Sequence, residues 1–299
     1  MTLRHSQAPF LAIVKIGFLA VRPASLLRLL LDCGKTCANE QDASGEPQIL
    51  NNLSSEWKAC RRFNMVQIVG HRGAPALAPE NTIESFKKAI EAGAHYLECD
   101  VHKSLDGRLA VIHDDRLDRT TNGTGYVRNF TLAELKALTL KDDLKIPTIE
   151  EVVELDFPLM IELKSYLDGD SKRTYEGLVP RLLRLLSEAS PRRDVVLSFT
   201  NAEYSDELRQ VPFKKLNLLP GFPGFDKVDS SGLFAIGVFY RDLTADLVVK
   251  AHERNLKVFS WPPDEEADIK RAISLGLDLL LSNNPGHAVE IAKQLGPTA

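Results

Sequence analysis

The chain has 299 residues, of which 44% are hydrophobic and 26% are charged, and its formal net charge at pH 7 is −4. This balance is typical of a globular protein with one large α/β domain or two smaller ones, and it excludes the strongly basic character of a nucleic-acid-binding protein. No run of about 18 uncharged apolar residues occurs, so no transmembrane helix is expected. The four cysteines are too few for a disulfide framework, and Cys33 and Cys37 have no second Cys/His pair nearby to complete a zinc site, which agrees with a cytoplasmic location.

Residues 1–64 differ in character from the rest of the chain. The stretch from Phe10 to Val21 is apolar but contains Lys15, which is compatible with a signal peptide or a membrane-surface helix. Residues 40–55 are rich in Asn, Ser, Glu and Gln, a composition typical of a linker or a disordered segment. We expect residues 1–64 to form a poorly ordered extension. It is either a targeting segment or a stretch upstream of a domain that begins at Met65, and membrane association stays open.

From residue 66 onward, short β-rich runs alternate with amphipathic helical patterns. Eight strands are expected, at residues 66–71, 96–101, 159–164, 195–199, 215–219, 234–240, 257–261 and 277–282. Helices are expected at residues 82–92, 175–189, 202–210, 244–254 and 265–275. Alternation of strand and helix predicts a parallel sheet, and eight units predict that residues 65–299 form a closed (β/α)8 TIM barrel. A doubly wound open sheet is the alternative, but no Gly-x-Gly-x-x-Gly follows the first strand.

One segment departs from this alternation. Asp106-Gly107 lies between two apolar runs and predicts a β-hairpin that ends at His113. Residues 114–154 then form a long insertion after the second strand, with helices expected at 132–138 and 149–154. We expect this insertion to lie over the mouth of the barrel.

Acidic side chains point into the predicted barrel from neighbouring strands. Glu98 and Asp100 are two residues apart on the second strand, and Glu162 and Lys164 are two apart on the third, so each pair shares a face. Three buried carboxylates repel one another, and a hard divalent cation with oxygen ligands, Mg2+ or Ca2+, would stabilise them. The alternative is ion pairing with Lys164 and Arg72 alone, which leaves two cations against three anions.

Two histidines adjoin this acidic group. His71 ends the first strand and His113 closes the hairpin. Imidazole titrates near neutral pH and suits general acid and base catalysis, while the guanidinium of Arg72 matches phosphate oxygens. Because active sites of TIM barrels lie at the carboxyl ends of the strands, the set indicates metal-assisted phosphoryl transfer.

Several motifs occur in a fixed order along the chain. They are His71-Arg72-Gly73, Pro79-Glu80-Asn81-Thr82, Glu98-Cys99-Asp100-Val101, His113-Asp114, Leu117-Asp118-Arg119-Thr120-Thr121-Asn122-Gly123, Ile146-Pro147-Thr148-Ile149-Glu150-Glu151 and Ile161-Glu162-Leu163-Lys164. In this order and spacing the sequence resembles the glycerophosphodiester phosphodiesterase family, from near residue 66 to near residue 290.

The resemblance implies roles for individual residues. The metal ligands would be Glu98, Asp100 and Glu162. The acid/base pair would be His71 and His113, and the phosphate would be held by Arg72 and Lys164. Glu80 and Asn81 would support the site, with helix capping as the alternative role. Trp261 would line the substrate cleft, with buried packing as its alternative.

The resemblance also implies the reaction. The glycerol 2-hydroxyl would attack phosphorus, and water would open the resulting cyclic phosphate, so that the products are glycerol 3-phosphate and an alcohol. The substrate would be a small phosphodiester, and the cofactor one divalent cation. A lysophospholipase D is the main alternative, with Phe222, Phe225, Phe234 and Phe239 as an apolar approach, and a non-catalytic binding barrel is a remote one.

Two positions depart from the family pattern. Ser282-Asn283-Asn284-Pro285 stands where the family usually has Thr-Asp-x-Pro, so Asn283 replaces an acid. Pro262-Pro263 follow Trp261 and are expected to alter the rim of the cleft. Neither change touches the expected metal ligands.

Overall fold

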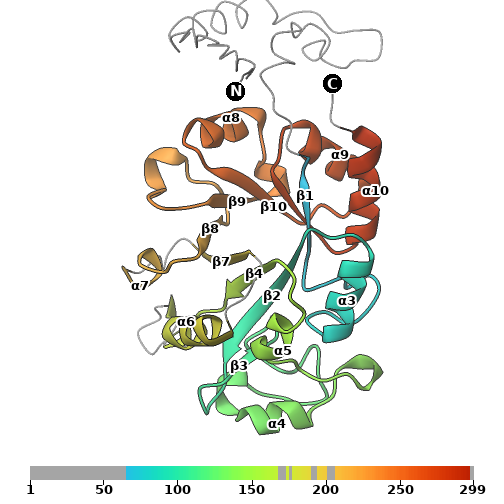
Figure 1. Cartoon of the computed structure of the whole chain (residues 1–299), viewed down its shortest axis with the longest axis vertical. Helices are drawn as coiled ribbons and strands as arrows, with labels where there is room; N and C mark the ends of the chain where they lie inside the picture. Colours follow the sequence, from blue (N-terminus) through green and yellow to red (C-terminus); the bar gives the residue numbers. More distant parts are fainter. Residues whose placement is uncertain (1–64, 168–172, 175–176, 190–193, 201–205, 297–299) are drawn as a thin grey trace, which may run out of the picture. The chain divides into compact units, whose positions relative to one another are not determined.

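Eight parallel strands form a closed barrel. The computed structural model describes residues 65–167, 173–174, 177–189, 194–200 and 206–296. The barrel strands are β1 (Gln67–Gly70), β2 (Tyr96–Lys103), β4 (Leu159–Leu163), β7 (Val195–Thr200), β8 (Lys214–Leu219), β9 (Ala235–Phe239), β10 (Lys257–Trp261) and β11 (Leu279–Ser282). Each pairs with the next, and β1 pairs with both β2 and β11, which closes the ring. The predicted TIM barrel is confirmed (Figure 1).

The strand prediction agrees closely with the structure, and the hairpin is confirmed as well. β2 runs on to Lys103 because its last residues pair antiparallel with β3 (Leu109–Val111) across the Asp106-Gly107 turn. Gly107 has a φ of 73°, a conformation that glycine adopts without steric cost. A short pair, β5 (Tyr166–Leu167) with β6 (Arg173–Thr174), was not expected.

Helices follow most strands, as expected. They are α3 (Ile83–Glu91), α6 (Leu178–Ala189), α7 (Asp206–Arg209), α8 (Ala245–Glu253) and α9 (Glu266–Ser274). Expected helical residues 175–176 and 202–205 lie outside the described residues. Sequence analysis missed α10 (Pro285–Leu295), although Asn284 caps its first turn, Pro285 opens it and Gly296 ends it.

Apolar side chains fill two layers, one inside the barrel and one between the strands and the helices. Along β2, Tyr96 belongs to the inner layer, whereas Leu97 and Cys99 belong to the outer one. Phe86 and Ala89 of α3 are fully buried in the outer layer. Because side chains alternate along a strand, the same rule that buries Cys99 outside the barrel directs Glu98 and Asp100 inward.

The inserted segment builds a small core of its own. It contains η2 (Val127–Asn129), α4 (Leu132–Ala137), η3 (Lys141–Asp143) and α5 (Ile149–Val153). Capping boxes at Thr131 and Thr148 begin α4 and α5. An apolar cluster that includes Leu117, Leu135 and Ile146 holds the segment against β3. The expected extension over residues 1–64 lies outside the described residues, and within the described part no helix is long and apolar enough to cross a membrane.

The loop between β1 and α3 is fixed against the start of α3. Ser85 donates a hydrogen bond through Oγ to the carbonyl of Arg72 (3.0 Å) and accepts one from the backbone N–H of Ala74 (2.8 Å). Gly73 has a φ of 90°, and a Cβ there would lie 2.5 Å from the carbonyl carbon of Ser85. The loop therefore has room for glycine alone at this position, and the close packing places His71 and Arg72 at the barrel mouth.

We predict that Gly73→Ala lowers the free energy of unfolding by about 2–4 kcal/mol, because positive φ and a backbone clash add together. Gly107→Ala is the matched control. Gly107 also has positive φ, but its Cβ would meet nothing within 4 Å, so the cost should be only about 1 kcal/mol. Urea unfolding followed by circular dichroism measures both. Equal effects of the two substitutions would contradict the proposed close packing.

Candidate active site

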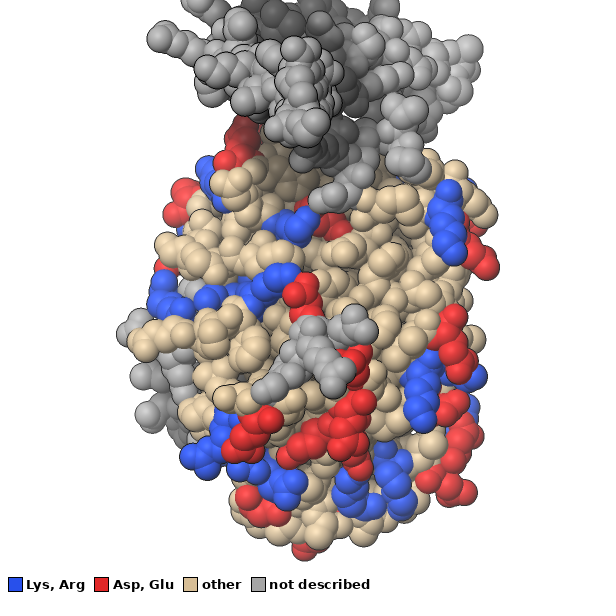
Figure 2. Space-filling model, in the orientation of Figure 1, with Lys and Arg blue, Asp and Glu red and all other residues tan. Residues whose placement is uncertain are grey.

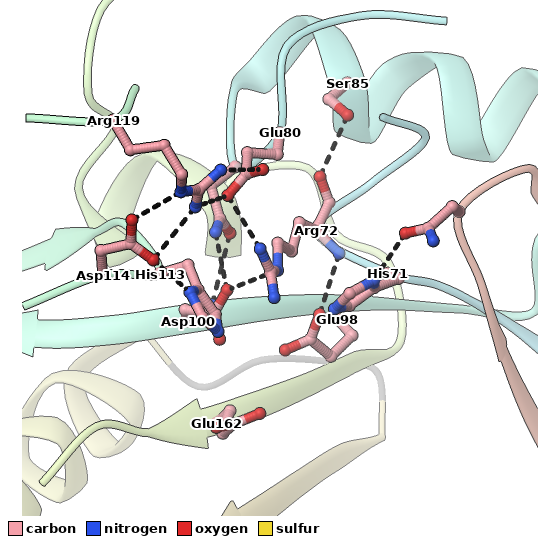
Figure 3. Close-up of polar contacts among 12 residues, drawn as sticks. His71, Arg72, Glu80, Ser85, Glu98, Asp100, His113, Asp114, Arg119 and Glu162 are labelled. Atoms are coloured by element: carbon pink, nitrogen blue, oxygen red, sulfur yellow. Dashed lines mark hydrogen bonds and ion pairs between the residues drawn. The ribbon is translucent and has the colours of Figure 1, made fainter. Parts of the chain in front are cut away.

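Polar side chains from three neighbouring strand ends meet at one end of the barrel. His71 and Arg72 directly follow β1, while Glu98 and Asp100 lie within β2. Asp100 pairs in register with Glu162 of β4, so the two carboxyl groups are neighbours across the sheet. Figure 3 shows these side chains gathered around the ends of β1, β2 and β4. The sequence-predicted set is therefore brought together by strand register.

Three carboxylates converge into a group that could hold a metal ion. Glu98, Asp100 and Glu162 each offer an oxygen, and these oxygens all lie within 4.8 Å of one another. Glu98 is 3% exposed and Asp100 is 1% exposed. Mg2+ and Ca2+ bind carboxylate oxygens, so the donor set fits a hard divalent cation.

The cations of the site do not neutralise all three acids. Arg72 Nε lies 3.3 Å from Asp100 Oδ2, and Lys164 Nζ lies 2.9 Å from Asp100 Oδ1. Lys164 also contacts Glu162. Both cations thus form ion pairs with Asp100, whereas Glu98 forms no ion pair with any described residue. The alternative of ion pairing alone leaves Glu98 unexplained.

Glu98 is the least satisfied of the three acids. Its Oε2 accepts a hydrogen bond from the backbone N–H of Arg72 (2.8 Å), but its buried Oε1 has no hydrogen-bond partner among the described residues. Burial, followed by the charges of Asp100 and Glu162, raises the pKa of Glu98 well above its ordinary value. An orphaned buried carboxylate oxygen that faces two other acids fits the position of a metal ligand.

Asp100 is held in its charged form. Burial opposes ionisation, but Lys164 and Arg72 outweigh it and hold the pKa of Asp100 well below its ordinary value. Asn81 Nδ2 donates to Asp100 Oδ2 (2.7 Å), and the backbone N–H of Asp100 donates to Asn81 Oδ1 (3.3 Å). Thr82, not Asn81, caps α3. Asn81 therefore contacts the site directly, and the capping alternative for it is wrong.

His71 directly follows β1 and is partly buried. Burial, with a smaller contribution from Arg72, lowers the pKa of His71 from 6.5 to about 4. Its Nδ1 lies 2.7 Å from Asn283 Oδ1. A pKa this low favours the neutral imidazole near pH 7.

His113 and Arg72 are joined by a network from the inserted segment. His113 Nδ1 lies 2.6 Å from Asp114 Oδ1, and Arg119 Nε donates to Asp114 Oδ2 (2.6 Å). Arg119 also donates to both carboxylate oxygens of Glu80 (2.7 and 2.9 Å), and Glu80 accepts from Arg72 Nη1 (2.9 Å). The hydrogen bond from Arg119 lowers the pKa of Asp114 to about 2. Glu80 thus supports Arg72 rather than a helix end (Figure 3).

Four residues that hold the site were assigned no role from the sequence. They are Asp114, Arg119, Ser85, which donates to the carbonyl of Arg72, and Asp264, which accepts from Asn283 Nδ2 at 2.9 Å. Asp114 and Arg119 stood inside a quoted motif, so an acid directly after a candidate histidine was the available signal. Asp264 gave none. Trp261 ends β10, is partly buried and packs near Phe259 with ring centroids 6.3 Å apart, so its packing role is visible.

Comparison with known proteins decides the family. The glycerophosphoryl diester phosphodiesterase family model matches residues 71–287. The chain belongs to this family. A glycerophosphodiester phosphodiesterase of Caldanaerobacter subterraneus subsp. tengcongensis is 32% identical over 244 residues, which cover 77% of this chain and 98% of that protein. One from Bacillus subtilis is 27% identical, over 73% of this chain and 83% of that protein.

Solved structures of the family share the fold. A glycerophosphodiester phosphodiesterase from Thermotoga maritima has a TM-score of 0.62 at 26% identity and covers 76% of this chain and 98% of that one. A phosphodiesterase from Oleispira antarctica, in complex with the product sn-glycerol-3-phosphate, has a TM-score of 0.67 at 23% identity over 77% and 97% of the two chains. Membership of the family makes this chain a phosphoric diester hydrolase, as the sequence resemblance predicted.

We predict that Arg119→Ala lowers kcat for diester hydrolysis about 10-fold, because Asp114 and Glu80 lose their shared partner and no longer hold His113 and Arg72. Arg119→Lys should recover part of the loss, since an ammonium lacks the planar fork that spans two carboxylates.

Arg116→Ala is the control for this prediction. Arg116 lies on the same segment, pairs with Asp118 at 3.1 Å on the surface and contacts none of the site residues named above. Its kcat should stay within about twofold of wild type, as expected for an exposed ion pair. Steady-state kinetics with circular dichroism of each variant give the answer, and an unchanged kcat in Arg119→Ala would contradict the role of the network.

Proposed function

We propose that the chain hydrolyses glycerophosphodiesters to glycerol 3-phosphate and an alcohol with one bound divalent cation, Mg2+ or Ca2+. The observation that carries the proposal is the convergence of three carboxylate oxygens within 4.8 Å beside two histidines and Arg72, with Glu98 Oε1 in neither a hydrogen bond nor an ion pair among the described residues. The names of the relatives, glycerophosphodiester phosphodiesterases at 32% and 27% identity, support the substrate class.

The proposed metal ligands are Glu98, Asp100 and Glu162. When bound there, the cation would offset their charge and stabilise negative charge that grows on the phosphoryl oxygens. The deficit that remains after Arg72 and Lys164 are counted explains why a cation fits this position.

The positive charge that holds the anionic substrate is local in this proposal. Figure 2 shows Lys and Arg interspersed with Asp and Glu on the face drawn, and the net charge of the whole chain is −4. Arg72 donates a hydrogen bond through Nη1 to Glu80, and its Nε lies near Asp100. Its remaining N–H groups are suited to phosphate oxygens. Lys164, whose pKa is raised by Asp100 and Glu162 against the effect of burial, stays charged. These two cations would orient the phosphate.

His71 and His113 are the proposed acid/base pair. One imidazole takes the proton of the glycerol 2-hydroxyl, whose oxygen then attacks phosphorus. The bond between phosphorus and the leaving oxygen breaks, and the other histidine, in its protonated form, gives that oxygen a proton. In the second step the roles reverse, since water attacks the cyclic phosphate and the ring oxygen leaves as the 2-hydroxyl. Each histidine ends in its starting protonation state.

The two histidines are held by partners of different charge. His113 Nδ1 lies 2.6 Å from Asp114 Oδ1, a carboxylate oxygen, whereas His71 Nδ1 faces the neutral amide of Asn283. A pair of imidazoles in unlike surroundings suits a reaction in which one group accepts a proton while the other donates one.

Nothing in the positions of the four phenylalanines favours the lysophospholipase D alternative. Phe222 and Phe225 pack against the outer apolar layer with ring centroids 5.0 Å apart, and Phe234 packs against the inner one. Phe239 stacks edge-on with Tyr240. Glycerophosphodiesters are therefore the proposed substrates, and a lysophospholipid belongs in the test.

The test is a panel of glycerophosphocholine, glycerophosphoethanolamine and a lysophospholipid, with glycerol 3-phosphate or released alcohol measured. We predict turnover of the glycerophosphodiesters with Mg2+ or Ca2+, and a loss of at least about 100-fold after chelation, because the acids then lack their cation. Glu98→Gln and Glu162→Gln should each lose about 100-fold in kcat/KM.

Glu84→Gln is the matched control, since Glu84 lies on the outer face of α3 with 49% of its side chain exposed. Its activity should equal that of wild type. Full activity in the presence of chelator would contradict the proposed metal dependence. Turnover of the lysophospholipid alone would replace the proposed substrate class with the lipid alternative.

A further inference from the structure

Three adjacent strands bring His71, Asn283 and Asp264 into line. Gly70 of β1 pairs in register with Ser282 of β11, so the residues that follow them, His71 and Asn283, are neighbours. The backbone fixes both, because His71 N donates to the Ser282 carbonyl (3.0 Å) and Ala76 N donates to the Asn283 carbonyl (3.2 Å). β11 pairs with β10 on the side away from β1, and Asp264 lies three residues beyond the end of β10.

A directional chain of hydrogen bonds joins the three side chains. Asn283 Nδ2 donates to Asp264 Oδ1 at 2.9 Å, and Asn283 Oδ1 lies 2.7 Å from His71 Nδ1. A carboxylate only accepts hydrogen bonds, so Asp264 determines which end of the Asn283 amide faces it. The amide oxygen must then face His71. A carbonyl oxygen needs a donor, and therefore His71 Nδ1 carries a proton.

We propose that Asn283, oriented by Asp264, is a positioning residue that fixes the Nδ1–H tautomer of His71. Nε2 is then the nitrogen that remains free for proton transfer. This inference rests on the proposed function for its kinetic consequence. It also gives a physical role to the asparagine that departs from the family pattern, since an amide directs the ring as a carboxylate would but adds no charge.

The backbone before Asp264 supports this arrangement. Pro262 and Pro263 separate Trp261 from Asp264, and Pro263 is buried. Proline fixes φ near −65°, so the exposed Asp264 is carried on a stiff segment. An exposed hydrogen bond on a flexible loop would constrain the amide less than one whose acceptor is held in place.

Four variants separate positioning from simple structural support. Asn283→Leu removes the acceptor and should lower kcat about 30-fold with KM within about twofold, because the ring loses its fixed tautomer while substrate contacts stay. Asp264→Asn gives Asn283 a neighbour that can accept or donate, so the orientation of the Asn283 amide is no longer forced and kcat should fall about threefold. Asn283→Asp alone sets a carboxylate against Asp264 and should cost about 10-fold. Glu290→Gln, at an exposed position of α10, is the neutral control.

The decisive variant exchanges the two side chains. Asn283→Asp/Asp264→Asn reverses the hydrogen bond between these two positions, so that the carboxylate at position 283 accepts from both neighbours and still accepts from His71 Nδ1, and kcat should return to within about threefold of wild type. Rescue beyond the sum of the single effects is a coupling that loss of folding does not produce. If the exchange variant were no better than Asn283→Asp alone, or if Asn283→Leu kept wild-type kcat, the proposal would be overturned.

The tautomer can be read without any assay of activity. In the full-length protein, imidazole 15N shifts at pH 7, assigned with His71→Gln, should show a protonated Nδ1 and an unprotonated Nε2 for His71. Asn283→Leu should shift the ring toward the Nε2–H tautomer. An unprotonated Nδ1 in the wild type would refute the inference even in an active enzyme. Absence of all diester turnover, with the expected 15N shifts, would refute the proposed function instead.

Discussion

Three acidic side chains in one barrel mouth, served by two cations, form the constraint on which the site depends. Asp100 takes both cations, Arg72 and Lys164, and Glu162 shares Lys164. Glu98 is left with a single backbone hydrogen bond and an oxygen without a partner in the described part of the chain. Burying an unpaired carboxylate is costly, so a protein that keeps this arrangement must offset it by a bound cation or by protonation. A divalent cation bound among the three carboxylates would offset their negative charge.

The barrel positions the reactive side chains at the ends of its strands, and residues of the surrounding loops hold those side chains by hydrogen bonds. The inserted segment reaches His113 through Asp114 and Arg72 through Glu80, with Arg119 as the common donor to both acids. On another side of the mouth, β10 and β11 reach His71 through neutral Asn283. The two imidazoles therefore have different partners, a carboxylate for His113 and a neutral amide for His71.

Local pattern was enough to predict the barrel and the convergence of Glu98, Asp100 and Glu162. Strand runs, the Asp106-Gly107 turn and the alternation that turns Glu98 and Asp100 inward all depend on neighbouring residues, and each was correct. α10 was not predicted, although Asn284 and Pro285 mark its start. Its capping signals were as clear as those of the helices that were found.

Partners that depend on register between distant segments were beyond local reasoning. Arg119 lies 39 residues from Glu80, and Asp264 lies 19 from Asn283, so no short motif contains both members of either pair. For Asn81 the sequence left helix capping as an alternative to a place in the site, and only the fold shows that Thr82 is the cap and that Asn81 contacts Asp100. Contacts of this kind join residues that only the folded barrel brings together.

The most direct measurement of the central claim is the position of a bound cation in crystals soaked with Mn2+, which accepts the oxygen ligands that suit Mg2+. The account predicts one anomalous scattering peak among Glu98, Asp100 and Glu162, with metal–oxygen distances of about 2.0–2.6 Å, and its loss in Glu98→Gln crystals. A peak elsewhere, or none at saturating Mn2+, would contradict the account and leave protonated Glu98 as the means by which the site carries three acids.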